Sequence, residues 1–219
     1  MSATVNEDFQ TAVSMTDFAS DDLYLLESTP TRITALLKVA KGTFISDVAI
    51  ELKLKNWHGV EILILEGSCT DNGQPVVQGA YLRIPTAKHY KVVAETDCIL
   101  FVKFNQFLDG DTGQRSIDTR IADKWLPGPI DGIKIRPLHV FDTESIMLLK
   151  WQHAAEFRPA LNPRGEEILV VNGLLQNRDH LYRQYSWIRN PIEDWRKWHG
   201  NTGTLIYYKS GHFPADAID

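Results

Sequence analysis

The chain has 219 residues, 43% of them apolar, and a formal net charge of -5. This apolar fraction is ordinary for a globular protein with a real core, and the length allows one large or two small domains. The negative charge disfavours a nucleic-acid partner, because phosphate binding needs clustered Lys and Arg. Since no apolar run approaches the ~20 residues that span a bilayer, and the acidic N-terminus does not resemble a secretory signal, we expect a cytoplasmic protein without a membrane partner.

The elements in chain order are mostly short strands. Residues 1–20 are polar and are expected to form a loose arm. Aliphatic or aromatic runs stopped by Gly or Pro follow and indicate strands; they lie at 36–44, 60–67, 79–85, 98–104, 146–157, 166–173, 185–191 and 204–210. No long amphipathic helix is evident. Strands at roughly ten-residue spacing favour an all-β fold with a sandwich or jelly roll.

The chain also repeats itself. Residues 61–85 recur as 167–191 with an offset of 106 and no gap, and 98–107 recur as 204–213. The identical pairs include Glu61/Glu167, Arg83/Arg189, Lys103/Lys209 and Phe107/Phe213. This period is too long for a solenoid and fits two copies of one domain. We therefore predict domains at 21–107 and 133–213, a Gly-, Asp- and Pro-rich linker at 108–132, and a tail at 214–219.

The two cysteines are not part of the shared framework. Cys69 and Cys98 correspond to Leu175 and Thr204 in the second repeat. Two thiols without CxxC spacing are typical of free cysteines in a reducing compartment. A disulfide between them is the alternative.

Several linked segments, found in order and twice, carry a family resemblance. In the first repeat these are EILILEG, Asp71, GAYLRIP, His89 and CILFVKFNQF; in the second they are GEEILVVNG, SWIRNP and GTLIYYKSGHF. Over about residues 30–213 the chain resembles the cupin superfamily, specifically the cupin domain of ChrR-type anti-sigma factors and two-cupin members of that group. The resemblance implies two tandem jelly-roll barrels, a pocket in each, and a metal site. The first 30 residues contain no His and no Cys, so we do not expect them to form the zinc-binding anti-sigma segment of those proteins.

The resemblance places the ligand carboxylate of the first barrel at Glu61. His58 and His89 each lie one position from the family's histidine positions. The metal hypothesis is therefore a site of His58, Glu61 and His89 that holds Zn, Fe, Mn or Ni. Because a one-residue slip in a strand turns a side chain to the other face, the alternative is that both histidines are polar residues near strand ends.

In the second barrel Glu167 keeps the carboxylate position. The other ligand positions fall on Leu161, Pro163 and either Trp195 or Arg196, so we predict no metal there. The barrel is then structural or holds an organic ligand.

Four residues are predicted to line ligand pockets: Tyr90, Arg83, Glu167 and Arg189. The two arginines are repeat-equivalent. Each is either a clamp for a ligand carboxylate or a structural cation that pairs with a protein carboxylate or strand-end carbonyls.

Three functions follow as hypotheses. The first is a ChrR-like regulatory or sensor module that binds a metal or small molecule in its first barrel and acts on a regulatory protein. The second is a metal-dependent enzyme of dioxygenase or isomerase type. The third is a structural partner that assembles through its barrels, as a monomer or homodimer.

Overall fold

The computed structural model describes residues 11–13, 23–54, 58–85, 91–160, 162–190 and 196–213. The chain divides into two compact units. The first unit is Asp17–Lys124, and the second unit combines Met1–Thr16 with Trp125–Asp219. Among the helices in the described part of the chain, none has the length and apolarity to cross a membrane.

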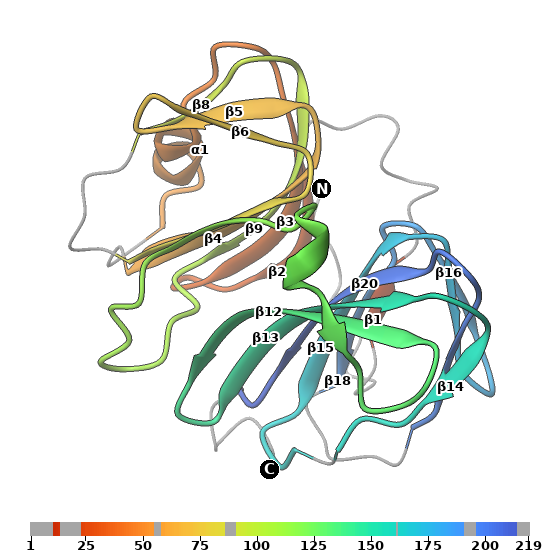
Figure 1. Cartoon of the computed structure of the whole chain (residues 1–219). Coiled ribbons are helices and arrows are strands. Elements are labelled where there is room, and N and C mark those ends of the chain that lie inside the picture. Colours follow the sequence, from red (N-terminus) through yellow and green to blue (C-terminus); the bar gives the residue numbers. More distant parts are fainter. Residues whose placement is uncertain are drawn as a thin grey trace. The chain divides into compact units, whose positions relative to one another are not determined.

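The first unit contains two sheets (Figure 1). The six-stranded sheet has the order β10-β7-β4-β9-β3-β2, with bounds Arg115–Asp118, Ala80–Pro85, Gly59–Glu66, Cys98–Phe104, Ile33–Val39 and Leu23–Ser28. The three-stranded sheet has the order β6-β5-β8, with bounds Gln74–Val77, Ser68–Asp71 and Val92–Ala94. The strand pairings of both sheets are antiparallel. A short 3-10 helix, Ala122–Lys124, lies near the end of this unit.

The core of the first unit lies between these sheets. Inward residues of β4 (Val60, Ile62 and Ile64) pack with inward residues of the neighbouring strands in one apolar cluster. The helix α1 (Ile45–Glu51) covers part of this cluster (Figure 1). Ile45 belongs to the cluster and Val48 packs against it, so the helix buries one face.

The second unit also contains two sheets. The seven-stranded sheet has the order β1-β18-β15-β20-β13-β12-β11, with bounds Thr11–Val13, Trp187–Asn190, Glu166–Asn172, Leu205–Ser210, Glu144–Trp151, Ile133–Phe141 and Leu126–Pro127. The four-stranded sheet has the order β14-β19-β16-β17, with bounds Ala155–Phe157, Trp198–Gly200, Leu174–Gln176 and Leu181–Arg183.

The two units repeat one another strand by strand. At the predicted offset of 106 residues, β4, β5, β6, β7, β8 and β9 correspond to β15, β16, β17, β18, β19 and β20. The all-β, jelly-roll-type prediction is confirmed. The segment predicted as a linker is partly sheet, because β10 pairs with β7 and β11 pairs with β12.

Each central strand ends at a glycine for a steric reason. Gly67 after β4 has φ 84° and Gly173 after β15 has φ 81°, a left-handed backbone that side chains disfavour. A Cβ atom at Gly67 would also lie 2.4 Å from the carbonyl oxygen of Asp97. These glycines turn the chain from the large sheet to the small sheet of each unit.

Candidate functional site

Strand alternation gives each large sheet two faces with different residues. Successive side chains point to opposite faces, so in β4 Val60 and Ile62 face the core while Glu61 faces away from it. The same alternation in β15 turns Ile168 to the core and Glu167 away from it. The repeat-identical carboxylates therefore lie outside the two cores.

The predicted ligand Glu61 belongs to a buried ion network. Its Oε1 lies 2.5 Å from Nη1 of Arg83, and the hydroxyl of Tyr81 donates to Oε2 at 3.3 Å. The other guanidinium nitrogen of Arg83 pairs with the carboxylate of Asp111. The guanidinium carbon of Arg83 also lies 3.9 Å from the ring centroid of Phe107. Because Arg83 is 0% exposed, it acts here as a structural cation.

Of the other two ligands predicted beside Glu61, only His58 lies among the described residues. His58 is exposed, and its backbone N–H donates to Oδ1 of Asn105 at 2.7 Å. His89 and Tyr90 lie outside the described residues. Within either unit by itself, the described His, Cys, Asp and Glu side chains form no converging group of three. The set of His58, Glu61 and His89 therefore stays a prediction.

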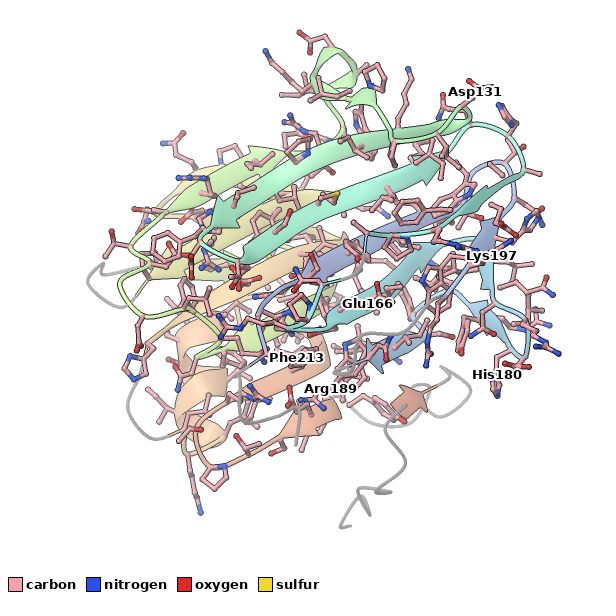
Figure 2. The ribbon with its side chains drawn as sticks, turned by 90° about the horizontal axis from the view of Figure 1, so that it is seen from below. Asp131, Glu166, His180, Arg189, Lys197 and Phe213 are labelled. Atoms are coloured by element: carbon pink, nitrogen blue, oxygen red, sulfur yellow. The ribbon has the colours of Figure 1, made fainter. Side chains whose placement is uncertain are left out.

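The predicted pocket residues of the second unit form a matching network. Glu167 is 0% exposed; its Oε1 accepts from Nε1 of Trp187 at 2.7 Å, and its Oε2 lies 3.2 Å from Nε2 of His212. The guanidinium carbon of Arg189 lies 4.3 Å from the ring centroid of Phe213, as Arg83 does over Phe107. Figure 2 shows Arg189 and Phe213. The repeat-identical pairs Glu61/Glu167 and Arg83/Arg189 therefore lie at equivalent places on the sheet face away from each core.

Glu166, the neighbour of Glu167, faces the core of the second unit (Figure 2). It lies on β15 between Asn190 of β18 and Ser210 of β20, its partners in the two ladders. The hydroxyl of Tyr208 donates to its Oε2 at 2.9 Å. We call Glu166, Asn190, Arg196, Trp198 and Tyr208 the Glu166 cluster.

The electrostatics of this cluster are those of a carboxyl group in an apolar interior. Burial raises the pKa of Glu166 above its ordinary value, while the hydrogen bond from Tyr208, the nearby polar side chains of Asn190 and Trp198 and the charge of Arg196 act in the opposite direction. Burial, followed by the charge of Glu166, raises the pKa of Tyr208 well above its ordinary value. A perturbed pKa with specific partners marks a candidate functional site.

Aromatic rings pack beside the Glu166 cluster. Tyr182 and Trp198 meet edge to face with centroids 5.9 Å apart, and Phe157 meets Tyr208 in the same way at 6.3 Å. Trp151 continues this row at 6.4 Å from Phe157. Aromatic walls with a few converging polar groups are typical of sites for small organic molecules.

The first unit has apolar residues at the equivalent positions. Glu166, Asn190, Trp198 and Tyr208 correspond to Val60, Ile84, Val92 and Val102, which all belong to the first core. The family resemblance drew the sequence prediction to Glu167, and it missed Glu166. The signal that could have found it is the alternation of Glu166 with the apolar Ile168 and Val170.

Comparisons with known proteins agree with this fold. A family model described as "ChrR Cupin-like domain" matches residues 114–214, which include the Glu166 cluster. No curated protein matches the sequence.

Three solved structures illustrate the likeness of the fold. A Cupin 2 conserved barrel domain protein from Leptotrichia buccalis has a TM-score of 0.58 at 9% identity, covering 91% of this chain and 95% of its own. Quercetin 2,3-dioxygenase from Acinetobacter baumannii has a TM-score of 0.58 at 13% identity, with coverages of 94% and 79%. Salicylate 1,2-dioxygenase from Pseudaminobacter salicylatoxidans has a TM-score of 0.59 at 9% identity, with coverages of 86% and 76%. Residues 114–214 thus match a ChrR Cupin-like family model, and the chain shares the fold of these solved structures.

Proposed function

We propose that this protein is a ChrR-like cupin regulatory module that binds a small organic molecule in its second unit, at the Glu166 cluster, and passes the signal to a regulatory protein. One observation carries the proposal: an inward-facing carboxyl group, hydrogen-bonded to Tyr208, lies in an otherwise apolar and aromatic interior. The family model that covers this unit supports the ChrR-like assignment. The site differs from our sequence-based expectation, which placed the ligand in the first barrel.

The energetics of the cluster favour a binding role over a purely structural one. A buried carboxyl group is costly even when hydrogen-bonded, and an apolar residue of suitable shape is often equally stable or better. Val60 is such an apolar residue at the equivalent position of the first unit. A carboxyl group kept in the second core is explained if it contacts a ligand.

The chemistry of the cluster suggests the class of ligand. Trp198 and Tyr182 offer aromatic surfaces, and a planar ring can stack or meet them edge to face. Arg196 and Asn190 supply N–H donors, and Glu166 accepts or donates according to its protonation. The cluster therefore suits an aromatic molecule that carries hydroxyl or carboxylate groups. Quercetin and salicylate, which appear in the names of two structural neighbours, are suitable first probes.

Thermal denaturation of the full chain tests the proposal. We expect quercetin or salicylate to raise the melting temperature of the wild type, because a ligand that binds only the folded state stabilises it. Glu166→Gln should abolish the shift or reduce it several-fold. Glu156→Gln is the matched control, since Glu156 is an exposed glutamate of the same unit. An equal shift in Glu166→Gln and wild type would contradict the assignment of the site.

A metal-dependent enzyme of dioxygenase or isomerase type is the alternative, and the dioxygenases among the structural neighbours favour it. It requires a resident Zn, Fe, Mn or Ni ion. Elemental mass spectrometry of untagged protein distinguishes the two functions. About one equivalent of metal per chain, lost in Glu61→Gln or His89→Ala but kept in Glu166→Gln, would support the enzyme and the predicted first-barrel site.

A further inference from the structure

The two cysteines of the chain lie side by side inside the first unit. Cys69 is on β5 of the small sheet and Cys98 is on β9 of the large sheet. Their sulfur atoms are 3.8 Å apart, and the residues are 1% and 3% exposed. Both thiols are free. The pair therefore faces across the gap between the two sheets at close range.

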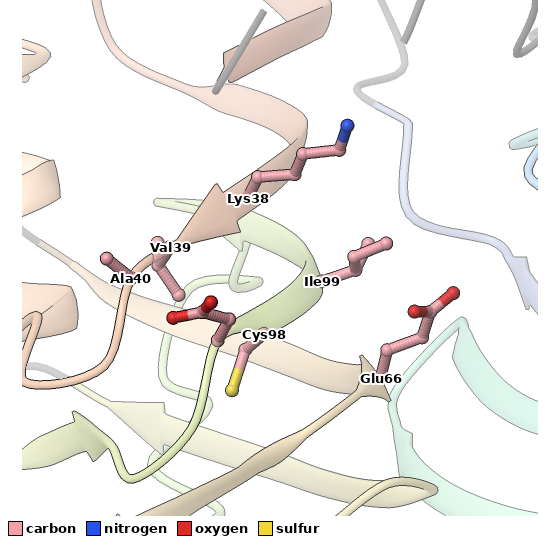
Figure 3. Close-up of a pocket in the computed structure, with 7 residues that line it drawn as sticks. Lys38, Val39, Ala40, Glu66, Cys98 and Ile99 are labelled. Atoms are coloured by element: carbon pink, nitrogen blue, oxygen red, sulfur yellow. The ribbon is translucent and has the colours of Figure 1, made fainter. Parts of the chain in front are cut away.

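A surface pocket reaches one of these two residues. Cys98 lines a cavity of about 450 Å³ together with Lys38, Glu66 and Asp97 (Figure 3). Cys69 does not line it. The thiol of Cys98 is positioned by two backbone carbonyl oxygens, of Ser68 and Thr96, each 3.2 Å from the sulfur. The arrangement is asymmetric, because Cys98 lines the cavity and Cys69 does not, although both residues belong to the buried core.

We propose that Cys98 and Cys69 form a redox-sensitive pair, in which a peroxide that enters this pocket converts them into a disulfide. In the first step the sulfur of Cys98 attacks one oxygen of hydrogen peroxide, which forms a sulfenic acid and releases water. In the second step the sulfur of Cys69 attacks the sulfur of that sulfenic acid, which forms the S–S bond and releases a second water. Overall two thiols are oxidised and one peroxide is reduced to two waters.

The surroundings of the two thiols assign these roles. Burial, together with the nearby Cys98, raises the pKa of Cys69 to about 12. The reactive form of a thiol is the thiolate, so Cys69 is a poor first nucleophile. It is well placed for the second step because the target sulfur is already close, and proximity raises the rate of such a step strongly.

The disulfide would join the small sheet to the large sheet of the first unit. Only a modest approach of the sulfurs is needed, from 3.8 Å to the ~2.05 Å of an S–S bond. The second unit has Leu175 and Thr204 at the equivalent positions, so the device is confined to the first unit. It is independent of the ligand site proposed for the second unit.

Intact mass spectrometry of the folded full-length protein tests the inference. We expect hydrogen peroxide to lower the mass by about 2 Da and to block later alkylation of both thiols. A peptide that links Cys69 to Cys98 should appear on digestion. The melting temperature should rise by roughly 5 °C, because a cross-link restricts the unfolded chain, and a reductant should reverse all three changes.

Two variants built from the second repeat assign the roles. In Cys69→Leu, a sulfenic acid should accumulate at Cys98 and be trapped by dimedone. In Cys98→Thr, Cys69 should stay unmodified. Unchanged thiols in folded wild type, under conditions that oxidise the denatured chain, would overturn the proposal. Disulfide-linked dimers without the internal cross-link would also overturn it. Since these results come from wild type, the test holds even if a variant fails to fold.

Discussion

The two units have similar residues on one face of the large sheet and different residues in their interiors. Away from the core, Glu61 with Tyr81 and Glu167 with Trp187 occupy the same places and make comparable hydrogen bonds. Toward the core, the first unit has Val60 where the second has Glu166. The glutamates that the two repeats share thus belong to the hydrogen-bonded face of each sheet, and Glu166, from which a binding site can be built, is found in one repeat only.

The largest change in unfolding free energy is expected when the inward residue of one unit is replaced by that of the other. Val60→Glu would put a carboxylate into the apolar first core without the hydrogen bonds that Glu166 has, and we expect it to cost about 4 kcal/mol of unfolding free energy at pH 7. The reverse exchange, Glu166→Val, removes a buried carboxyl group and should change stability by no more than about 1 kcal/mol. Urea unfolding of the full chain measures both. Equal costs would show that the interiors are not specialised.

Loss of Arg83, the buried cation on the sheet face away from the first core, should lower the unfolding free energy. Arg83→Met removes the guanidinium that pairs with the buried Glu61 and Asp111, and we expect a loss of about 3 kcal/mol. Arg120→Met is the control, because Arg120 pairs with Asp118 at the surface of the same unit, with the two side chains 59% and 37% exposed. That exposed pair should contribute about 0.5 kcal/mol or less. Similar effects of the two variants would argue against a structural role for Arg83.

A smaller effect concerns pH and the Glu166 cluster. The pKa of Glu166 is raised in the folded state from an ordinary value near 4.5, so the folded protein binds this proton more tightly than the unfolded chain does. This contribution to stability is present below about pH 4.5 and is lost as the pH rises through the folded pKa. Glu166→Gln should remove this part of the pH dependence, which denaturation at several pH values measures. An unchanged pH profile in the variant would place the raised pKa elsewhere.

Much of the fold could be predicted from the sequence. The runs that became β4, β7, β9, β15, β18 and β20 were recognisable because each is short, apolar or aromatic, and bounded by Gly or Pro. The repeat predicted two similar halves, and the strand correspondence confirms it. The pairing of Thr11–Val13 with Trp187–Arg189 was not predictable, because a pairing over such a sequence distance leaves no local pattern.

The candidate site was harder to predict, for a physical reason. Sequence identity between the repeats drew attention to Glu61 and Glu167, but identity reflects whatever both units need, and both need the same buried network. A ligand site in one unit appears instead as a difference between repeats, such as Val60 against Glu166. Deciding which of two adjacent glutamates faces inward required the strand register, and one residue of slip reverses the answer.

The strand β1 has a consequence for the order in which the protein is made. Thr11–Val13 is synthesised well before its partner β18. Domains generally fold from the N-terminus as synthesis proceeds. The first unit can therefore fold before the sheet that pairs with Thr11–Val13 has been synthesised. Until β1 pairs with it, β18 is an edge strand with unpaired backbone groups, and such an edge can pair with other chains. Pairing of Thr11–Val13 with β18 is thus a late step that covers this edge of the sheet.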